Sequence, residues 1–212
     1  MNKLVKGSIA GGLGVVLLLG GAGTLALWNQ TAVVAGGNVT AGLLTIDATG
    51  GAQSWRDISA EVVNPTTAPD GVAIADIANY KIVPGDKIKF TKVVTVKATG
   101  DHLKGKLSYD DATIVAPVVA GATAQNTANA DLKAKLLPTF TATGTGVTST
   151  TTGGVTEYFV TPGTTAINTT VTLTLTLELP AAVGNTTGEG VIAQNGTVNL
   201  TGVAFKLNQI RP

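Results

Sequence analysis

A single histidine, His102, is the side chain best suited to acid–base or metal chemistry in this chain of 212 residues. Asp101, Asp110 and Asp111 lie close to it in the sequence. A zinc peptidase needs two or three His or carboxylate ligands and a general base, which a His-Glu-x-x-His helix often supplies. The chain has no such pattern, and these four residues fall on a predicted strand and turn without ligand spacing. We therefore interpret them as solvated turn residues.

The other polar residues form no catalytic pattern either. No serine lies in a nucleophile elbow, and no glycine loop carries a Walker lysine. Four scattered glutamates, Glu61, Glu157, Glu178 and Glu189, do not indicate which two would pair for glycoside hydrolysis. The chain has no cysteine, which excludes thiolate metal sites and cysteine nucleophiles. We expect no enzymatic activity, no metal and no cofactor.

The composition indicates an extracellular β-protein with small side chains. Charged residues make up 13% of the chain, about half the average for soluble proteins, and aromatic residues only 4%. Threonine and glycine take their place, and threonine favours strands. The formal net charge is +1, so we expect no nucleic-acid partner.

Residues 170–180, TVTLTLTLELP, give the clearest secondary-structure signal. Apolar and polar side chains alternate strictly, which predicts a strand with one buried face and one wet face. The predicted buried residues are Val171, Leu173, Leu175, Leu177 and Leu179.

A second strand is predicted at residues 87–97, after the turn Pro84-Gly85-Asp86. Lys92 falls on its apolar face. We therefore expect the strand to end or bulge there, or to lie at a sheet edge where an inward lysine deters wrong pairing.

Shorter patterns complete the fold. We expect a helix at residues 130–137, capped by Asn129 and ended by Pro138, and a β-bulge at Gly202 in a last strand at residues 197–210. A loop is predicted at 64–71, a loop or hairpin end at 144–154, and further strands at 43–47, 54–58, 102–109, 139–143 and 155–161. Together these patterns predict an all-β chain: one jelly-roll-like antiparallel β-sandwich over residues 43–212, with one short helix.

Residues 1–26 have the features of a secretory signal peptide. Lys3 and Lys6 precede an apolar stretch, and Thr24 and Ala26 are small residues at a cleavage site before Leu27. Cleavage leaves 12 basic residues (14 less two) against 13 acidic ones, a net charge of −1. The alternative is a retained anchor, because about 20 apolar residues can span a bilayer. We expect a secreted protein that contacts the membrane only through the uncleaved leader.

The order of these motifs resembles the TasA/camelysin family of exported proteins, in particular its actinobacterial members with a SipW-type signal peptide. The motifs are the glycine-rich leader ending in Thr-x-Ala, then Leu-Trp-Asn, then the stretches at residues 40–46 and 82–88, and an apolar last strand. The resemblance is weak at residues 110–165. It implies cleavage by a SipW-type signal peptidase and assembly into extracellular biofilm-matrix fibres. For camelysin-type relatives it also implies a metallopeptidase, which the single histidine disfavours.

In this family the mature N-terminal segment of one subunit adds as a strand to the next, and residues 27–42 fit that role. The segment is uncharged and rich in β-branched residues, and the residues expected to contact a neighbour are Trp28, Val33, Val34 and Val39. Repeated head to tail, the contact makes a homopolymer. The accepting strand is expected at residues 87–97 or 198–207. Two alternatives remain: the segment is the chain's own first strand or a loose terminus, or the protein is a monomeric adhesin that binds through loops 144–154 and 185–190.

Overall fold

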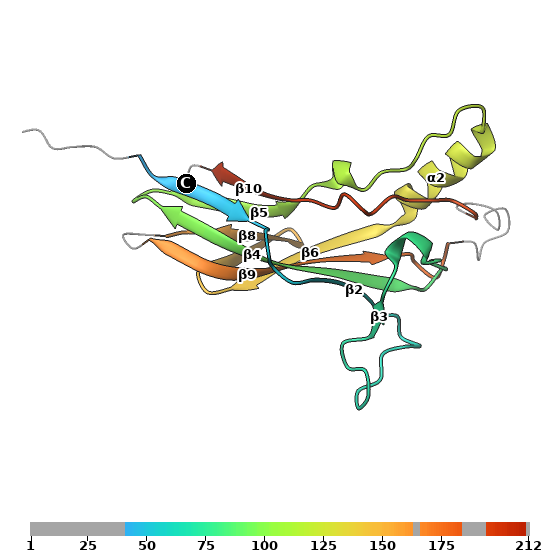
Figure 1. The fold of residues 1–212 in the computed structure, drawn as a ribbon, viewed down its shortest axis with the longest axis horizontal. Coiled ribbons are helices and arrows are strands. Elements are labelled where there is room, and N and C mark those ends of the chain that lie inside the picture. Colours follow the sequence, from blue (N-terminus) through green and yellow to red (C-terminus); the bar gives the residue numbers. More distant parts are fainter. Residues whose placement is uncertain (1–40, 163–165, 184–193, 211–212) are drawn as a thin grey trace, which may run out of the picture. The chain divides into compact units, whose positions relative to one another are not determined.

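The chain folds into two antiparallel sheets, one of six strands and one of four, with one α-helix in the described residues (Figure 1). The computed structural model describes residues 41–162, 166–183 and 194–210, all of which belong to the compact unit Ala41–Pro212. The predicted antiparallel β-sandwich with one short helix is confirmed. The expected signal peptide and residues 27–40 of the extended segment lie outside the described residues.

Two long strands, β4 (Lys87–Thr99) and β9 (Ile167–Glu178), form the centre of the six-stranded sheet and pair along their length. The ladder runs from Lys87 opposite Glu178 to Ala98 opposite Ile167. The sheet order is β3-β2-β4-β9-β6, and β1 also pairs with β4. The outer strands are β1 (Leu43–Asp47), β2 (Gln53–Asp57), β3 (Val72–Ile74) and β6 (Leu137–Gly144).

The four-stranded sheet has the order β10-β5-β8-β7. The chain passes from one sheet to the other between β4 and β5, β5 and β6, β6 and β7, β8 and β9, and β9 and β10, as in jelly-roll-like sandwiches. Its strands are β5 (Lys104–Tyr109), β7 (Val147–Thr152), β8 (Val155–Val160) and β10 (Phe205–Ile210).

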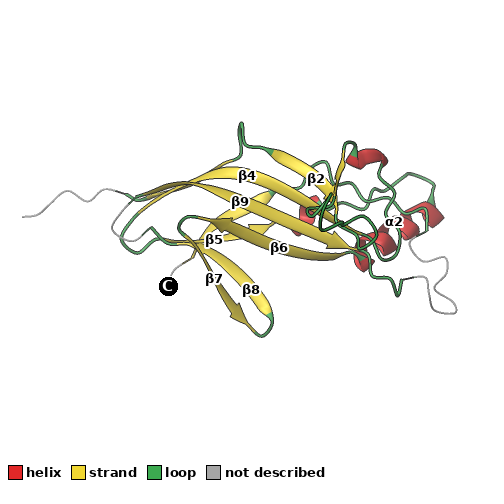
Figure 2. Cartoon of the chain, turned by 90° about the horizontal axis from the view of Figure 1, so that it is seen from below, coloured by secondary structure: helices red, strands yellow, loops and turns green. Residues whose placement is uncertain are grey.

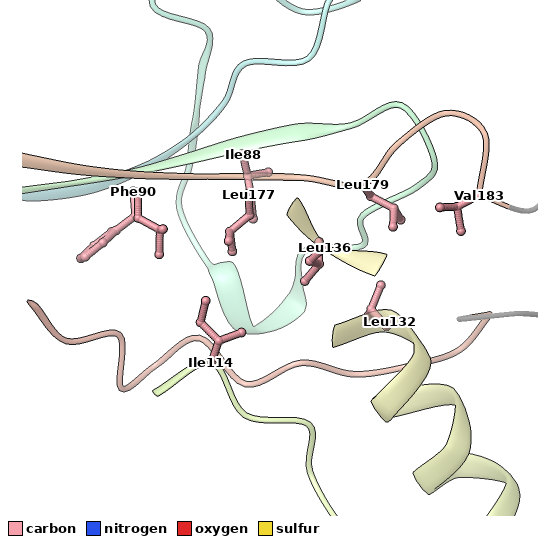
Figure 3. Packing of buried hydrophobic residues seen from close by; sticks show 9 residues of the cluster. Ile88, Phe90, Ile114, Leu132, Leu136, Leu177, Leu179 and Val183 are labelled. Atoms are coloured by element: carbon pink, nitrogen blue, oxygen red, sulfur yellow. The ribbon is translucent and has the colours of Figure 1, made fainter. Parts of the chain in front are cut away.

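Alternating leucines and valines of β9 form the middle of the core, as the sequence pattern predicts. Val171, Leu173, Leu175 and Leu177 have no exposed surface, because the second sheet and the α-helix cover their face. Two clusters divide this core. The sheet-to-sheet core consists of Val94, Val96, Ala98, Leu103, Leu107, Ala142, Val160, Val171 and Leu173. The α2-end core consists of Ile88, Phe90, Ile114, Leu132, Leu136, Leu175, Leu177, Leu179 and Val183 (Figure 3).

Lys92 lies on the buried face of β4, but the strand neither ends nor bulges there, and it is not an edge strand. The expectation for this residue is therefore wrong. The Lys92 ammonium donates a hydrogen bond to the Gly51 carbonyl at 2.9 Å, in the connection between β1 and β2. The ammonium group has a hydrogen-bond partner because the connection between β1 and β2 places the Gly51 carbonyl beside β4 at this point.

The α-helix is longer than predicted and begins earlier. It is α2 (Thr123–Lys135), and two short 3-10 helices, η1 (Ile77–Asn79) and η2 (Asp111–Thr113), flank strands elsewhere. Asn129 is therefore not the N-cap but an interior helix residue, 1% exposed. The predicted cap is wrong because its side chain makes tertiary hydrogen bonds, which no local pattern reveals.

Residues 144–154 form the end of a hairpin, one of the two alternatives expected for them. They contain β7, and Gly153 and Gly154 form the turn to β8 with φ of 58° and 81°. Two successive positive φ angles match a type I′ hairpin turn. Figure 2 shows this hairpin extending away from the rest of the strands. Gly202 lies in a turn rather than a bulge, because Asn199 accepts hydrogen bonds from the amide and hydroxyl of Thr201.

Candidate functional site

The structure separates the residues considered for acid–base chemistry. His102 is exposed in the turn between β4 and β5, whereas Asp110 and Asp111 follow β5 at its other end. A six-residue strand spans about 20 Å, so His102 cannot share a site with the two aspartates.

Both aspartates have structural partners. Asp110 caps η2 by accepting from the Ala112 amide, and it pairs with Lys206 at 2.8 Å. The hydrogen bond from Lys206 is the main reason why the pKa of Asp110 is lowered, and the Ala112 amide adds to it. Asp111 lies 3.7 Å from the Lys133 ammonium of α2. These contacts join β10 and α2 to the segment after β5.

Within residues 41–162, 166–183 and 194–210, no three His, Cys, Asp or Glu side chains are grouped so that they could hold a metal ion. In the same ranges, no helix has the length and apolar character needed to cross a membrane.

The strand edges differ from the expectation. Residues 87–97 belong to β4, which pairs with β9 on one side and with β1 and β2 on the other, so this predicted acceptor strand is wrong. Residues 198–204 are irregular, and only Phe205–Ile210 form β10. In the described part of the chain β10 pairs with β5 alone, so its outer edge is unpaired there.

A pocket of about 760 Å³ lies at the end of the sandwich where α2 packs, and we call it the α2-end pocket. Its floor is apolar: Ile88 of β4 and Leu177 of β9 contribute to it, with Leu132 and Leu136 at the end of α2. Figure 3 shows Leu132 and Leu136 on the α2 side of this core, across from the ribbon of β9. Among the described lining residues, Lys81 is the only charged one.

The first wall of this pocket is the segment Tyr80–Val83, which follows η1. Tyr80 donates a hydrogen bond of 2.6 Å to the Asp57 carboxylate, whose other oxygen accepts from the amide and hydroxyl of Ser59. Ser59, 2% exposed, in turn accepts from the Lys87 amide. This network attaches the wall to β2 and to the start of β4.

The network shifts the pKa values of both partners. Partial burial, the largest single effect, raises the pKa of the Asp57 carboxyl, but the hydrogen bonds from Ser59 and Tyr80 together lower it below its ordinary value. Burial, followed by the hydrogen bond to Asp57 and the charges of Asp57 and Asp86, raises the pKa of Tyr80 far above the ordinary range. At neutral pH, Asp57 is therefore charged and Tyr80 is neutral, the states that form the bond best.

The second wall is the segment of residues 195–198, which lies against α2. The Asn129 side chain accepts from the Thr197 amide at 2.7 Å and donates to the Pro117 carbonyl at 2.7 Å. Gln125 donates to the Asn195 carbonyl. A Cβ atom added to Gly196 would lie 2.3 Å from a main-chain oxygen of α2, so only glycine allows this approach.

Main-chain groups on both walls are without partners among the described residues. The amides and carbonyls of Lys81 and Ile82 take part in no hydrogen bond there, and the same holds for the amide of Val198. Ile82 and Val198 are half-buried, with side chains on the pocket. The pocket therefore has an apolar floor, and its walls are segments with main-chain donors and acceptors to spare, a combination that suits an extended peptide.

The predicted functional residues themselves lie outside the described residues. This applies to the cleavage-site residues Thr24, Ala26 and Leu27, and to the strand-donor residues Trp28, Val33, Val34 and Val39. The wall residues Lys81, Ile82, Gly196 and Val198 were not found by sequence reasoning. The one available signal was the apolar run Ile82-Val83 directly before the Pro-Gly turn, outside any predicted strand.

Comparison of the chain with protein-family models, with curated proteins and with solved structures gives no match. The class that the fold defines is therefore that of an antiparallel β-sandwich with one helix at its end, as far as the described residues extend.

Proposed function

We propose that this chain is a secreted structural protein of the TasA/camelysin type, which joins extracellular biofilm-matrix fibres by N-terminal strand addition. A SipW-type signal peptidase cleaves before Leu27, and the exposed segment pairs with a second copy of the protein. Assembly requires no metal or cofactor, and the polymer is a head-to-tail homopolymer.

One observation carries the proposal: residues 7–42 contain no charged side chain, and they lead directly into a β-sandwich whose outer strands have edges unpaired among the described residues. Residues 27–40 are rich in β-branched side chains, and such a segment satisfies its main chain best along another strand. The outer edge of β10, which pairs with no other described strand, and the walls of the α2-end pocket both offer main-chain groups. A contact between the N-terminal segment of one copy and a different surface of the next repeats without closing, which gives a filament.

The experiment is electron microscopy of the secreted chain that starts at Leu27, with N-terminal sequencing of the same preparation. We expect filaments and a Leu27 start. Deleting residues 27–37 leaves the sheets intact, because they begin at Leu43, and we expect a folded monomer that forms no filaments. Filaments from the shortened chain would refute strand donation.

A pair of matched substitutions tests the same point without a deletion. Val34→Asp places a charge in the donor segment, where pairing would bury it, and we expect polymer mass to fall at least about tenfold. Val118→Asp is the control, because Val118 is 85% exposed on the connection before α2. Equal loss from both variants would point to a general charge effect. Monodisperse particles from the unaltered chain would favour the adhesin, and proteolysis of casein abolished by His102→Ala would favour the peptidase.

A further inference from the structure

The two ends of the sandwich differ in a way that bears on polymer geometry. β1 begins at Leu43, opposite Thr99 at the last residue of β4, whereas Ile88 near the start of β4 lines the α2-end pocket. Eleven residues of strand (99 less 88) separate the two positions, which corresponds to about 36 Å. The described chain therefore begins at the end of the sandwich opposite the pocket, as Figure 1 also shows for β1 and α2.

The pocket has the chemistry to receive a strand rather than a compact polar ligand. Its two walls, represented by Ile82 and Val198, are main-chain segments with amides that have no partner among the described residues. Between them lies the apolar floor of Ile88, Leu177 and Leu179. An extended peptide in this position can form hydrogen bonds with a wall while its alternate side chains bury apolar surface.

The segment 27–40 has the matching composition. The segment contains no charged residue, and Lys81 is the only charged residue among the described residues that line the pocket. Val33 and Val34 point to opposite faces of any strand that contains both, so one of them faces the floor in either register. An uncharged, β-branched strand loses little hydration on entering such a pocket, whereas a charged one would lose much more.

From these observations we infer that the α2-end pocket is the acceptor site, and that its occupant is residues 27–40 of a second copy of this chain. The inference rests on the proposed function and makes it specific, because it selects this pocket over the open edge of β10. The copies then join in line, each contributing its N-terminal segment at one end and its pocket at the other.

The chain has no native cysteine, so introduced cysteines report the contact without background. One copy starting at Leu27 carries Val33→Cys or Val34→Cys, and the other carries Ile82→Cys. After mixing and mild oxidation, we expect disulfide-linked dimers on a non-reducing gel from at least one donor position. The matched control acceptors are Thr150→Cys on the outer edge strand β7 and Asn208→Cys on β10, both exposed, and we expect at least about tenfold less dimer from them.

The outcomes separate the two proposals. A higher yield of disulfide-linked dimer with Asn208→Cys than with Ile82→Cys would overturn the acceptor assignment, but it would still support strand addition. A chain carrying both Val34→Cys and Ile82→Cys that links only within itself would make the pocket a site for its own segment, and would overturn the second copy as occupant. Filaments by electron microscopy without any Ile82 crosslink would also refute the pocket. Absence of both filaments and crosslinks would refute the acceptor assignment together with the proposed function.

A second pair of variants tests the pocket without oxidation. Val198→Trp fills the space between the walls, and Val155→Trp adds the same side chain at a position that is 65% exposed on β8. We expect the first to abolish filaments and the second to retain them, with both thermal midpoints close to that of the unaltered chain. Normal filaments from a folded Val198→Trp variant would overturn the inference.

Discussion

The two halves of the core use the same pair of central strands but are covered differently. In the sheet-to-sheet core, Val94 and Leu173 face β5 and β8, whose main chains are paired with each other. In the α2-end core, Ile88 and Leu177 are covered by a helix, a 3-10 turn and two irregular segments. The first half is closed by hydrogen-bonded strands, and the second half contains a pocket whose walls carry main-chain groups unpaired among the described residues.

The difference shows how a β-sandwich restricts where it can be extended. A closed sheet pair satisfies its own main chain, so an added strand finds no unpaired main-chain groups between its layers. Irregular covering segments fill the end of the sandwich without a complete ladder, which leaves room and partners for one more strand. The same alternation of leucine and valine in β9 therefore contributes to a core covered by paired strands at one end and to a core that contains a pocket at the other.

The largest effect expected from this comparison concerns two leucines of the stripe that runs along β9. Leu173→Ala, in the sheet-to-sheet core, should lower the free energy of unfolding by about 4 kcal/mol, because the closed layers cannot collapse into the cavity. Leu179 lines the pocket, and Leu179→Ala should cost only about 2 kcal/mol, because part of its surroundings is already open. Urea unfolding measures both, with the outward-facing Thr174→Ala as control. Equal losses would mean that the two halves are packed alike.

The next effect concerns the wall at residues 195–198. Asn129→Ala leaves the Thr197 amide and the Pro117 carbonyl without their partner, which should cost about 2–3 kcal/mol. Asn126→Ala is the matched control, because Asn126 also bonds a main chain, that of Val119, but through hydrogen bonds exposed to water. We expect the control to cost less than about 1 kcal/mol, since water replaces the lost bonds. Similar values for both would show that the C-terminal wall is not held by Asn129.

A smaller effect is expected at the other wall. Tyr80→Phe removes one hydrogen bond to the Asp57 carboxylate and should lower the free energy of unfolding by about 1 kcal/mol, because both groups keep some contact with water. Tyr158→Phe is the control, since its hydroxyl has no hydrogen bond within the described ranges and its ring packs against Phe140. Chemical denaturation of the two variants tests this. An unchanged free energy of unfolding for Tyr80→Phe would show that the hydrogen bond to Asp57 does not hold this wall against β2.

The smallest effect is a pH dependence from the same network. The pKa of Asp57 in the folded chain lies below its ordinary value of 3.8. Its contribution to stability is therefore complete above that value and is lost as pH falls through the lower, folded pKa. Unfolding curves measured from neutral pH down to strongly acidic pH should fall less steeply at the acid end for Asp57→Asn than for the unaltered chain. Other aspartates also titrate in this pH range. Parallel curves for the two proteins would therefore show that Asp57 does not contribute to the pH dependence of stability.

The sequence predicted those parts of the fold that depend on local alternation. The strict pattern of β9 placed Leu173 and Leu177 on the buried face, and both have no exposed surface. The strand Leu43–Asp47 is also as predicted. In these segments each residue's burial follows from that of the residues two positions away, so the two-residue period of the sequence is sufficient to predict which side chains are buried.

What the sequence could not predict depends on contacts between distant segments. Lys92 is accommodated in a central strand because the Gly51 carbonyl, between β1 and β2, accepts a hydrogen bond from its ammonium, and Asn129 lies within α2 because it binds Thr197. The strand β7 is rich in threonine and has no buried residue, so its pattern did not distinguish a loop from the end of a hairpin. The α2-end pocket forms because Tyr80–Val83 and residues 195–198 both line it, although they lie far apart in the sequence. Local sequence patterns do not predict that two such distant segments lie at one pocket.

The large sequence separation between paired strands also limits how early and how fast the protein can fold. β4 pairs with β9, and β10, which ends at Ile210, pairs with β5 and begins its ladder opposite Tyr109. Sandwiches dominated by such long-range pairs fold slowly, in milliseconds to seconds, because long loops must close before their contacts form. Under the proposed export, which starts from the N-terminus, β10 would be the last of the described strands to emerge, so the four-stranded sheet could not be completed before then. The wall at residues 195–198 would emerge almost last, and the proposed acceptor pocket would then form only outside the cell.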